Sequence, residues 1–158
     1  MGLKNLKTSE KLETSGIWLE VENNRIKLAR AGGSNKKYEM AMERFARKYG
    51  KALNMISETV GRKFFHETYA ETIILDWLYA DENGDLNEEG RDYAQESLER
   101  KTRWSRGINI DDENILTFEP ENVVKVLNEF SPMFPLMKEV AEDFNNYKSS
   151  LVEGIVGN

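Results

Sequence analysis

Residues 16–35 contain the pattern that most restricts how this chain can fold. Apolar side chains alternate with polar or bulkier ones along two short runs, at Ile17, Leu19, Val21, Ile26 and Leu28. An alternation with a period of two is typical of a strand that is buried on one face. Asn23 and Asn24 separate the runs, and asparagine tolerates the positive φ angles of a two-residue hairpin turn. The sequence therefore predicts a β-hairpin over residues 16–31.

A turn at Asn23 and Asn24 also predicts the register of the two strands. The predicted pairs join apolar to apolar and acid to base: Val21 with Ile26, Leu19 with Leu28, Glu22 with Arg25, and Glu20 with Lys27. Each pair of this kind stabilises a sheet by about 0.2–1 kcal/mol. An isolated hairpin is only marginally stable in water, so we expect the helices that follow to cover its apolar face.

Composition limits the classes of protein to which the chain can belong. Its 158 residues, 39% hydrophobic and 32% charged, are typical of one soluble globular domain. A formal net charge of −6 argues against nucleic acid as the main partner, because affinity for nucleic acid comes largely from neutralised phosphates. There is no cysteine, so we expect no disulfide framework, thiolate nucleophile or cysteine-based zinc site. Without a signal peptide or an apolar run of membrane-spanning length, the chain is expected to be cytosolic.

The rest of the chain predicts one mainly helical domain of the α+β class. Residues 1–15 are polar and aperiodic and predict a flexible arm, residues 16–148 the globular domain, and residues 149–158 a flexible C-terminal tail. Apolar side chains at helical spacing predict helices over about 36–59, 62–79, 87–104, 120–130 and 132–148. The expected architecture is an N-terminal β-hairpin packed on a bundle of about four to five helices.

Two of these helices have unusual faces. The predicted helix over 36–59 carries a basic stripe opposite its apolar face, at Lys36, Lys37, Arg44, Arg47, Lys48 and Lys51. Such a run is usually a solvated face, with contact to nucleic acid or an acidic partner as the alternative. The helix over 62–79 is apolar nearly all round and is expected to be buried. Asp76 interrupts it, and we expect this carboxylate to lie at a rim or to be paired.

The sequence contains no complete catalytic or metal-binding motif. His66 is the single histidine, and a zinc-protease signature would need a second histidine where Ala70 stands. Residues 80–87 resemble a calcium loop superficially, but the positions that require glycine and glutamate hold Leu86 and Asp92. We therefore expect no catalytic residue, no cofactor and no metal ion.

Several segments together resemble a known family. They are GIWLEV, IKLARAGGSNKKY, IILDW, FEPENVVKVL and SPMFPLMKEVA, with a basic helix and an acidic glycine turn between them. Over roughly residues 15–147 this combination resembles the tail assembly chaperones of long-tailed bacteriophages. Residues 86–115 depart from the pattern, as an insertion carrying the third predicted helix would.

The resemblance implies a non-enzymatic protein of the host cytoplasm. It would bind the phage tape measure protein while tail tube subunits assemble, with the tail tube protein as a second expected partner. We expect neither a membrane nor nucleic acid as a partner. Whether the protein forms a homo-oligomer is left open. A structural component of the tail or head-to-tail connector is the first alternative. A small enzyme using Asp76 or His66, or a nucleic-acid-binding protein using the basic stripe, are the others.

Partner-binding residues are expected near the C-terminus, because amphipathic partner helices dock with their apolar stripe in a groove and methionine adapts to varied partners. The candidates for such a groove are Phe130, Met133, Phe134 and Met137. Core packing is the alternative for these four. Leu151, Val152 and Ile155 make the C-terminal tail a candidate docking peptide, with simple fraying as the alternative.

Overall fold

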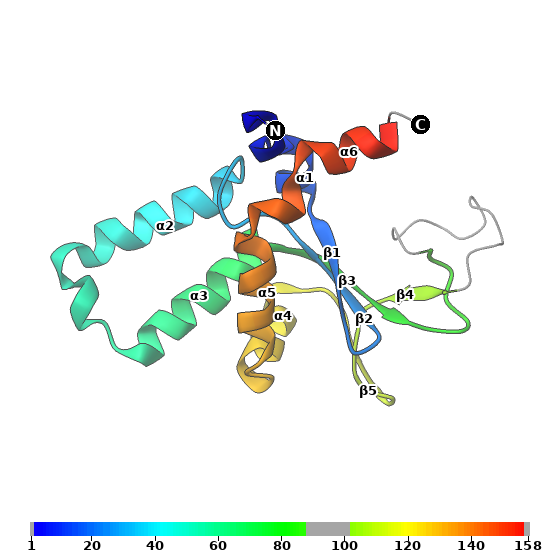
Figure 1. Ribbon diagram of the computed structural model, residues 1–158. Coiled ribbons are helices and arrows are strands. Elements are labelled where there is room, and N and C mark those ends of the chain that lie inside the picture. The colour runs from blue at the N-terminus through cyan, green and yellow to red at the C-terminus, as the bar shows by residue number, and fades with distance from the viewer. Residues whose placement is uncertain (1, 88–101, 157–158) are drawn as a thin grey trace.

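The predicted hairpin forms, and it is one half of a larger sheet (Figure 1). The computed structural model describes residues 2–87 and 102–156, and within them an antiparallel four-stranded sheet has the order β1-β2-β3-β4. Its strands are β1 (Ile17–Val21), β2 (Asn24–Leu28), β3 (Ile74–Ala80) and β4 (Trp104–Arg106). A second hairpin consists of β5 (Ile108–Asp111) and β6 (Asn114–Leu116).

Helices precede, interrupt and follow the strands. They are α1 (Glu10–Ser15), α2 (Lys36–Tyr49), α3 (Glu58–Thr72), α4 (Pro120–Glu129), α5 (Met133–Glu142) and α6 (Ser149–Val156). Short 3-10 helices cover Leu3–Leu6, Gly50–Met55 and Phe144–Tyr147. The α+β class is therefore confirmed. None of the helices within residues 2–87 and 102–156 has both the length and the apolar character of a membrane span.

The turn of the β1–β2 hairpin lies one residue earlier than predicted. Glu22 and Asn23 form it, with φ angles of 46° and 63°. Leu19 consequently pairs with Ile26, where the prediction paired it with Leu28. This register shift is two residues, and because side chains alternate with a period of two, the apolar ones still share a face.

Asn24 explains why the turn moves. Its buried side chain donates from Nδ2 to the carbonyl oxygen of Glu22 at 3.0 Å. Its Oδ1 accepts the backbone N–H of Asn109 in β5 at 2.8 Å. Asn24 is the first residue of β2, and from this position it joins the hairpin to β5. The local sequence could not predict this contact, because Asn109 is 85 residues away.

The predicted helix over 62–79 is wrong in its second half. The helix there is α3, which ends at Thr72, and Ile74–Ala80 is the strand β3 between β2 and β4. Trp77 and Leu78 point to opposite faces of the sheet and are both almost fully buried. A central strand that is buried on both faces has the same unbroken apolar run as a buried helix, so periodicity alone does not distinguish them.

Other predicted helix ends also change. The helix over 36–59 stops at Tyr49 because Gly50 turns the chain with a φ of 46°. Most of the helix over 87–104 lies outside the described residues, and its last residue, Trp104, belongs to β4. The helix over 120–130 is confirmed as α4 with Pro120 in its first turn, whereas the one over 132–148 ends at Glu142.

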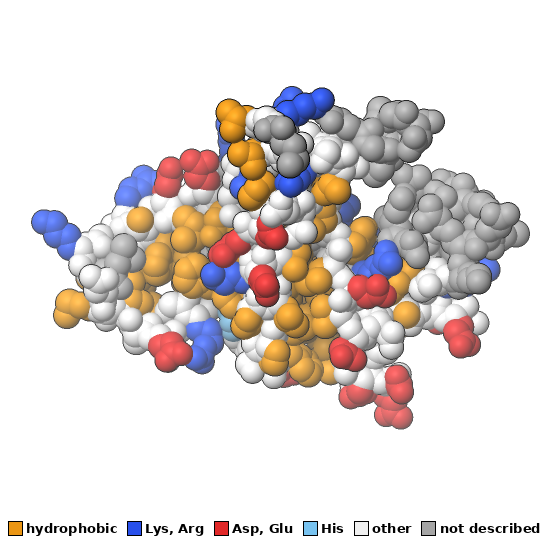
Figure 2. Space-filling model, in the orientation of Figure 1, with side chains coloured by type: hydrophobic (Ala, Val, Ile, Leu, Met, Phe, Trp, Pro, Cys, Tyr) orange, Lys and Arg blue, Asp and Glu red, His pale blue; other side chains and the backbone are white. Residues whose placement is uncertain are grey.

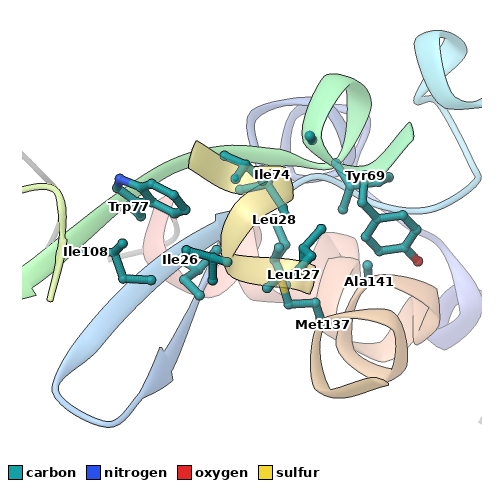
Figure 3. Packing of buried hydrophobic residues seen from close by; sticks show 13 residues of the cluster. Ile26, Leu28, Tyr69, Ile74, Trp77, Ile108, Leu127, Met137 and Ala141 are labelled. Carbon is teal, nitrogen blue, oxygen red and sulfur yellow. The ribbon is translucent and has the colours of Figure 1, made fainter. Parts of the chain in front are cut away.

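The main core lies between one face of the sheet and the helices α3, α4 and α5. Figure 3 shows β2 and β3 side chains meeting side chains of these helices. Trp77 of β3 is almost fully buried in this layer and makes an edge-to-face contact with Phe118, with 5.4 Å between ring centroids. The hairpin is thus covered by helices as expected, but as part of a sheet and not as an addition to a helical bundle.

Both ends of the chain have regular structure where flexible segments were predicted. Ser9 caps α1, and Glu13 of this helix is buried and paired with Arg30. The backbone of Thr8 pairs with that of Lys148, which places the start of α6 beside the N-terminal segment. Residues 7–15 are therefore held against the domain by a buried ion pair and backbone hydrogen bonds, whereas residues 2–7 are exposed.

Candidate partner-binding site

The helices α2 and α3 form an antiparallel hairpin between two neighbouring strands of the sheet, β2 and β3. We call residues 36–72 the α2–α3 arm. Figure 1 shows the arm extending away from the sheet, with the Gly50–Met55 turn at its outer end. Figure 1 shows α3 beside α2 along the arm, and the α2 side chains of Phe45 and Tyr49 are only half-buried.

Asn35 ties the two ends of the arm together. Its side chain is buried, and Nδ2 donates to the carbonyl oxygens of Arg30 at 2.9 Å and Thr72 at 3.0 Å. Its Oδ1 accepts the backbone N–H of Tyr38 at 3.4 Å and so caps α2. One amide therefore joins the start of α2 to the end of α3.

Replacing Asn35 by alanine is expected to lower the free energy of unfolding by about 2–3 kcal/mol, because the buried carbonyl oxygen of Thr72 and the partly buried one of Arg30 lose their donor and α2 loses its cap. The control is Ser57→Ala, which removes only the cap of α3 and should cost about 1 kcal/mol. Urea unfolding followed by circular dichroism measures both. Equal losses would show that Asn35 acts only as a cap.

Five aromatic side chains form a continuous cluster along the arm and onto α5. We call it the aromatic belt; its members are Tyr49, Phe45, Phe64, Phe65 and Phe134, all half-buried. Phe45 and Phe64 stack with 3.8 Å between ring centroids, and Phe64 lies 5.2 Å from Phe65. Phe65 in turn lies 6.3 Å from Phe134. The belt thus connects α2, α3 and α5 while part of each ring stays accessible.

The belt lies between two hollows on either side of α3. The first, which we call the arm groove, has a volume of about 450 Å³ and is lined by both helices of the arm, including Phe45 and Phe64. The second has a volume of about 600 Å³ and is lined by Phe65, His66 and Phe134. Figure 2 shows hydrophobic side chains gathered between α2 and α3 and over α4 and α5. Both hollows fall within the range of about 300–1,000 Å³ usual for ligand sites.

His66 is held in place beside the second hollow. Its side chain is buried, and Nδ1 lies 2.7 Å from Oδ1 of Asn128 in α4. An amide oxygen only accepts, so the Nδ1 atom carries the proton and a neutral ring would present Nε2 as an acceptor. The ring also lies 5.2 Å from Phe134. This geometry makes His66 a link between α3 and α4 at the edge of the belt.

Asp76 is paired, as predicted. Its Oδ1 accepts the backbone N–H of Trp77 at 2.8 Å, and its Oδ2 lies 3.8 Å from a guanidinium nitrogen of Arg106. These contacts place Asp76 on the sheet, whereas His66 lies on α3. Asp76 and His66, the two residues considered as catalytic candidates, therefore belong to different parts of the fold.

The four residues predicted to form one groove do not do so. Phe134 belongs to the aromatic belt, whereas Phe130 and Met133 line a separate hollow of about 180 Å³ beside the β1–β2 turn. Met137 is only 2% exposed and packs in the main core, which is the alternative given for it from the sequence. Met133 and Phe134 meet different neighbours because adjacent residues on a helix point about 100° apart.

The predicted C-terminal docking peptide lies elsewhere. Leu151 is exposed and Val152 half-buried on α6, which Figure 1 places beside the N-terminal elements, away from the junction of α4 and α5. The side chain of Ile155 is outside the described residues. The structure therefore does not bring these residues together with Phe130, Met133 and Phe134.

Phe45, Phe64 and Phe65 were missed as candidates for partner binding. In the sequence, Phe45 belongs to an apolar stripe on the helix predicted over 36–59, and Phe64 and Phe65 belong to the helix over 62–79 that is expected to be buried. What the sequence did not show is that the arm leaves the sheet, so that these rings pack mainly on each other. An apolar stripe on a helix indicates that something covers it, but not whether that cover belongs to the same chain.

Among residues 2–87 and 102–156, no group of three or more histidine, aspartate or glutamate side chains is placed to hold a metal ion. Comparisons of the chain with protein-family models, with curated proteins and with solved structures give no match.

Proposed function

We propose that this protein is a non-enzymatic tail assembly chaperone of a long-tailed phage. It would act in the host cytoplasm by holding amphipathic helices of the tape measure protein, with the tail tube protein as a second partner. Two observations support the proposal: the segments between residues 15 and 147 that resemble this family, and the aromatic belt beside an open groove. Of these two observations, the aromatic belt is the one on which the proposal mainly rests.

The belt suits a protein that holds another polypeptide. Aromatic side chains bury a large area and dominate the energetics of interfaces. Here five rings are half-buried, contact one another and keep part of their surface accessible. An amphipathic helix places its apolar residues in a groove of this kind without needing any reaction.

Co-expression with the tape measure protein encoded with this chain tests the proposal. We expect the chaperone to raise the soluble yield of the tape measure protein and to co-purify with it. The double variant Phe45→Ser/Phe64→Ser should weaken the interaction at least roughly tenfold, which is about 1.4 kcal/mol. Both rings lie on the arm, outside the sheet core, so the variant should keep its far-ultraviolet circular dichroism.

A matched control separates the belt from exposed apolar surface in general. Leu3 and Leu6 are 82% and 56% exposed near the N-terminus. The variant Leu3→Ser/Leu6→Ser should co-purify like the wild type. The proposal fails if wild-type protein neither co-purifies with the tape measure protein nor raises its yield, or if a folded belt variant binds undiminished.

A structural component of the virion is the second candidate, and the position of β1 favours it. This strand is at the edge of the sheet. The pair Val21 and Asn24 flanks the two-residue turn, and its position determines which residues of β1 form backbone hydrogen bonds with β2. Trp18 and Glu20 then direct their backbone N–H and C=O groups away from β2, where a neighbouring strand could add. Stoichiometric copies in purified particles would support this role, and their absence would support the chaperone.

A further inference from the structure

The walls of the arm groove consist of two matching rows of side chains. Ala41, Phe45 and Tyr49 line it from α2 at spacings of four residues, and Val60, Phe64 and Thr68 line it from α3 at the same spacing. Residues four apart lie on the same side of a helix. The rows therefore offer two parallel ridges to a third helix, as in a three-helix arrangement. Each row spans about 12 Å, enough for two to three turns of a bound helix.

The rims of the groove carry different charges. On the α2 side both charged lining residues, Arg44 and Lys48, are basic and exposed. On the α3 side Lys63 lies 4.0 Å from Glu67, so these two compensate each other, and Glu71 lies nearer the root of the arm. Among the residues that the structure describes, no acidic side chain is paired with Arg44 or Lys48. The α2 rim is therefore a positive edge beside an aromatic floor.

We infer that the arm groove binds a partner helix whose apolar stripe is bordered by acidic residues, and that these residues lie against Arg44 and Lys48. This inference rests on the proposed function and specifies the chemistry of the segment that is held. The whole chain has a formal charge of −6, so long-range electrostatics disfavour an acidic partner. A preference for acidic helices would thus come from the groove itself.

Two synthetic peptides of about 18 residues, a length that suits a helix formed on binding, test the inference. They share one leucine stripe at helical spacing and carry either glutamate or lysine at every position that borders it. At low ionic strength, where the screening length exceeds about 10 Å, wild-type protein should bind the glutamate peptide roughly tenfold more tightly. Fluorescence anisotropy of labelled peptides measures both dissociation constants, and added salt should reduce the difference.

Two charge variants of α2 locate the effect. Arg44→Glu/Lys48→Glu should abolish the preference for the glutamate peptide or reverse it. Lys36→Glu/Lys37→Glu changes the net charge equally on the same helix, but neither residue lines the groove, so the preference should persist. Equal effects of the two variants would mean that the helix charge as a whole is recognised, and would overturn the inference. Equal binding of both peptides by wild type, or tighter binding of the lysine peptide, would also overturn it.

The outcome is distinguishable from that of the proposed function. If the tape measure protein co-purifies but no charge preference appears, the inference fails and the chaperone proposal stands. If the glutamate peptide is preferred but the tape measure protein does not bind, the groove is an acidic-helix site and the chaperone proposal fails. Salt-sensitive binding of a single-stranded oligonucleotide that disappears in Arg44→Glu/Lys48→Glu would assign the rim to nucleic acid and overturn the inference.

Discussion

Replacing Trp77 by alanine is expected to lower the free energy of unfolding by about 3–5 kcal/mol. Trp77 is 1% exposed in the central strand β3, pairs across the sheet with Ile26 and meets Phe118 edge to face. Its removal takes a large apolar surface out of the main core and leaves a cavity that rigid strands on either side cannot fill. Urea unfolding followed by far-ultraviolet circular dichroism measures the loss.

Trp18→Ala is the matched control. Trp18 lies on the edge strand β1 and is only half-buried, with the ammonium group of Lys27 over its ring. Its replacement should cost about 1–2 kcal/mol, because a partly solvated site leaves a smaller cavity. Similar losses for the two tryptophans would contradict the greater contribution expected from the burial of Trp77 in the core.

Replacing Glu13 by glutamine is expected to destabilise the fold by about 3 kcal/mol at neutral pH. The Glu13 side chain is 2% exposed and forms an ion pair with Arg30, whose backbone N–H also donates to the Glu13 carbonyl oxygen at 2.9 Å. Breaking a buried pair leaves a charge without its partner. The loss of stability should lie at the low end of the range for buried ion pairs, because 21% of the Arg30 side chain is exposed and water can partly solvate its charge. Glu10→Gln on the exposed side of the same helix should change stability little.

The same pair predicts how stability depends on pH. Burial alone would raise the pKa of Glu13, but hydrogen bonds from Arg30 and Ser34 and the charge of Arg30 outweigh it, so the pKa lies below the ordinary 4.5. The unfolded chain then binds a proton at a higher pH than the folded one does. The contribution of Glu13 is therefore complete above pH 4.5 and is lost as pH falls through the lower folded value.

Urea midpoints at neutral pH and at about pH 3 test this sign. The wild type should lose more stability on acidification than Glu13→Gln, because glutamine has no proton to gain. Glu10→Gln should follow the wild type. Parallel pH profiles for the wild type and Glu13→Gln would show that the pair with Arg30 does not shift the titration of Glu13.

The β1–β2 hairpin and the α4 helix could be predicted because their signals are local. Alternating side chains defined the two strands, and Pro120 marked the start of α4. The register could not be predicted, since it depends on the hydrogen bond between Asn24 and Asn109, which is 85 residues away. A turn one residue earlier costs nothing in apolar pairing, so the apolar pattern alone does not distinguish the alternatives.

The candidate site was predictable only in part. Phe134 was identified from its place on an apolar helix face, but Met137 on the next turn of α5 faces the core. The choice between core and surface depends on what lies opposite each turn. Phe45 and Phe64 show the reverse case, since their stripe was visible and its cover is incomplete in the folded chain.

By itself the sequence determined the α+β class, the faces of the hairpin and the presence of apolar stripes on α2, α3 and α5, because these follow from side-chain periodicity along a few turns or strand residues. Only the tertiary structure decided that residues 74–80 are a strand, that the arm stands away from the sheet and that its aromatic side chains remain accessible. The reason is physical: periodicity records which side of an element avoids water, whereas the identity of the covering surface depends on contacts between residues far apart in the chain.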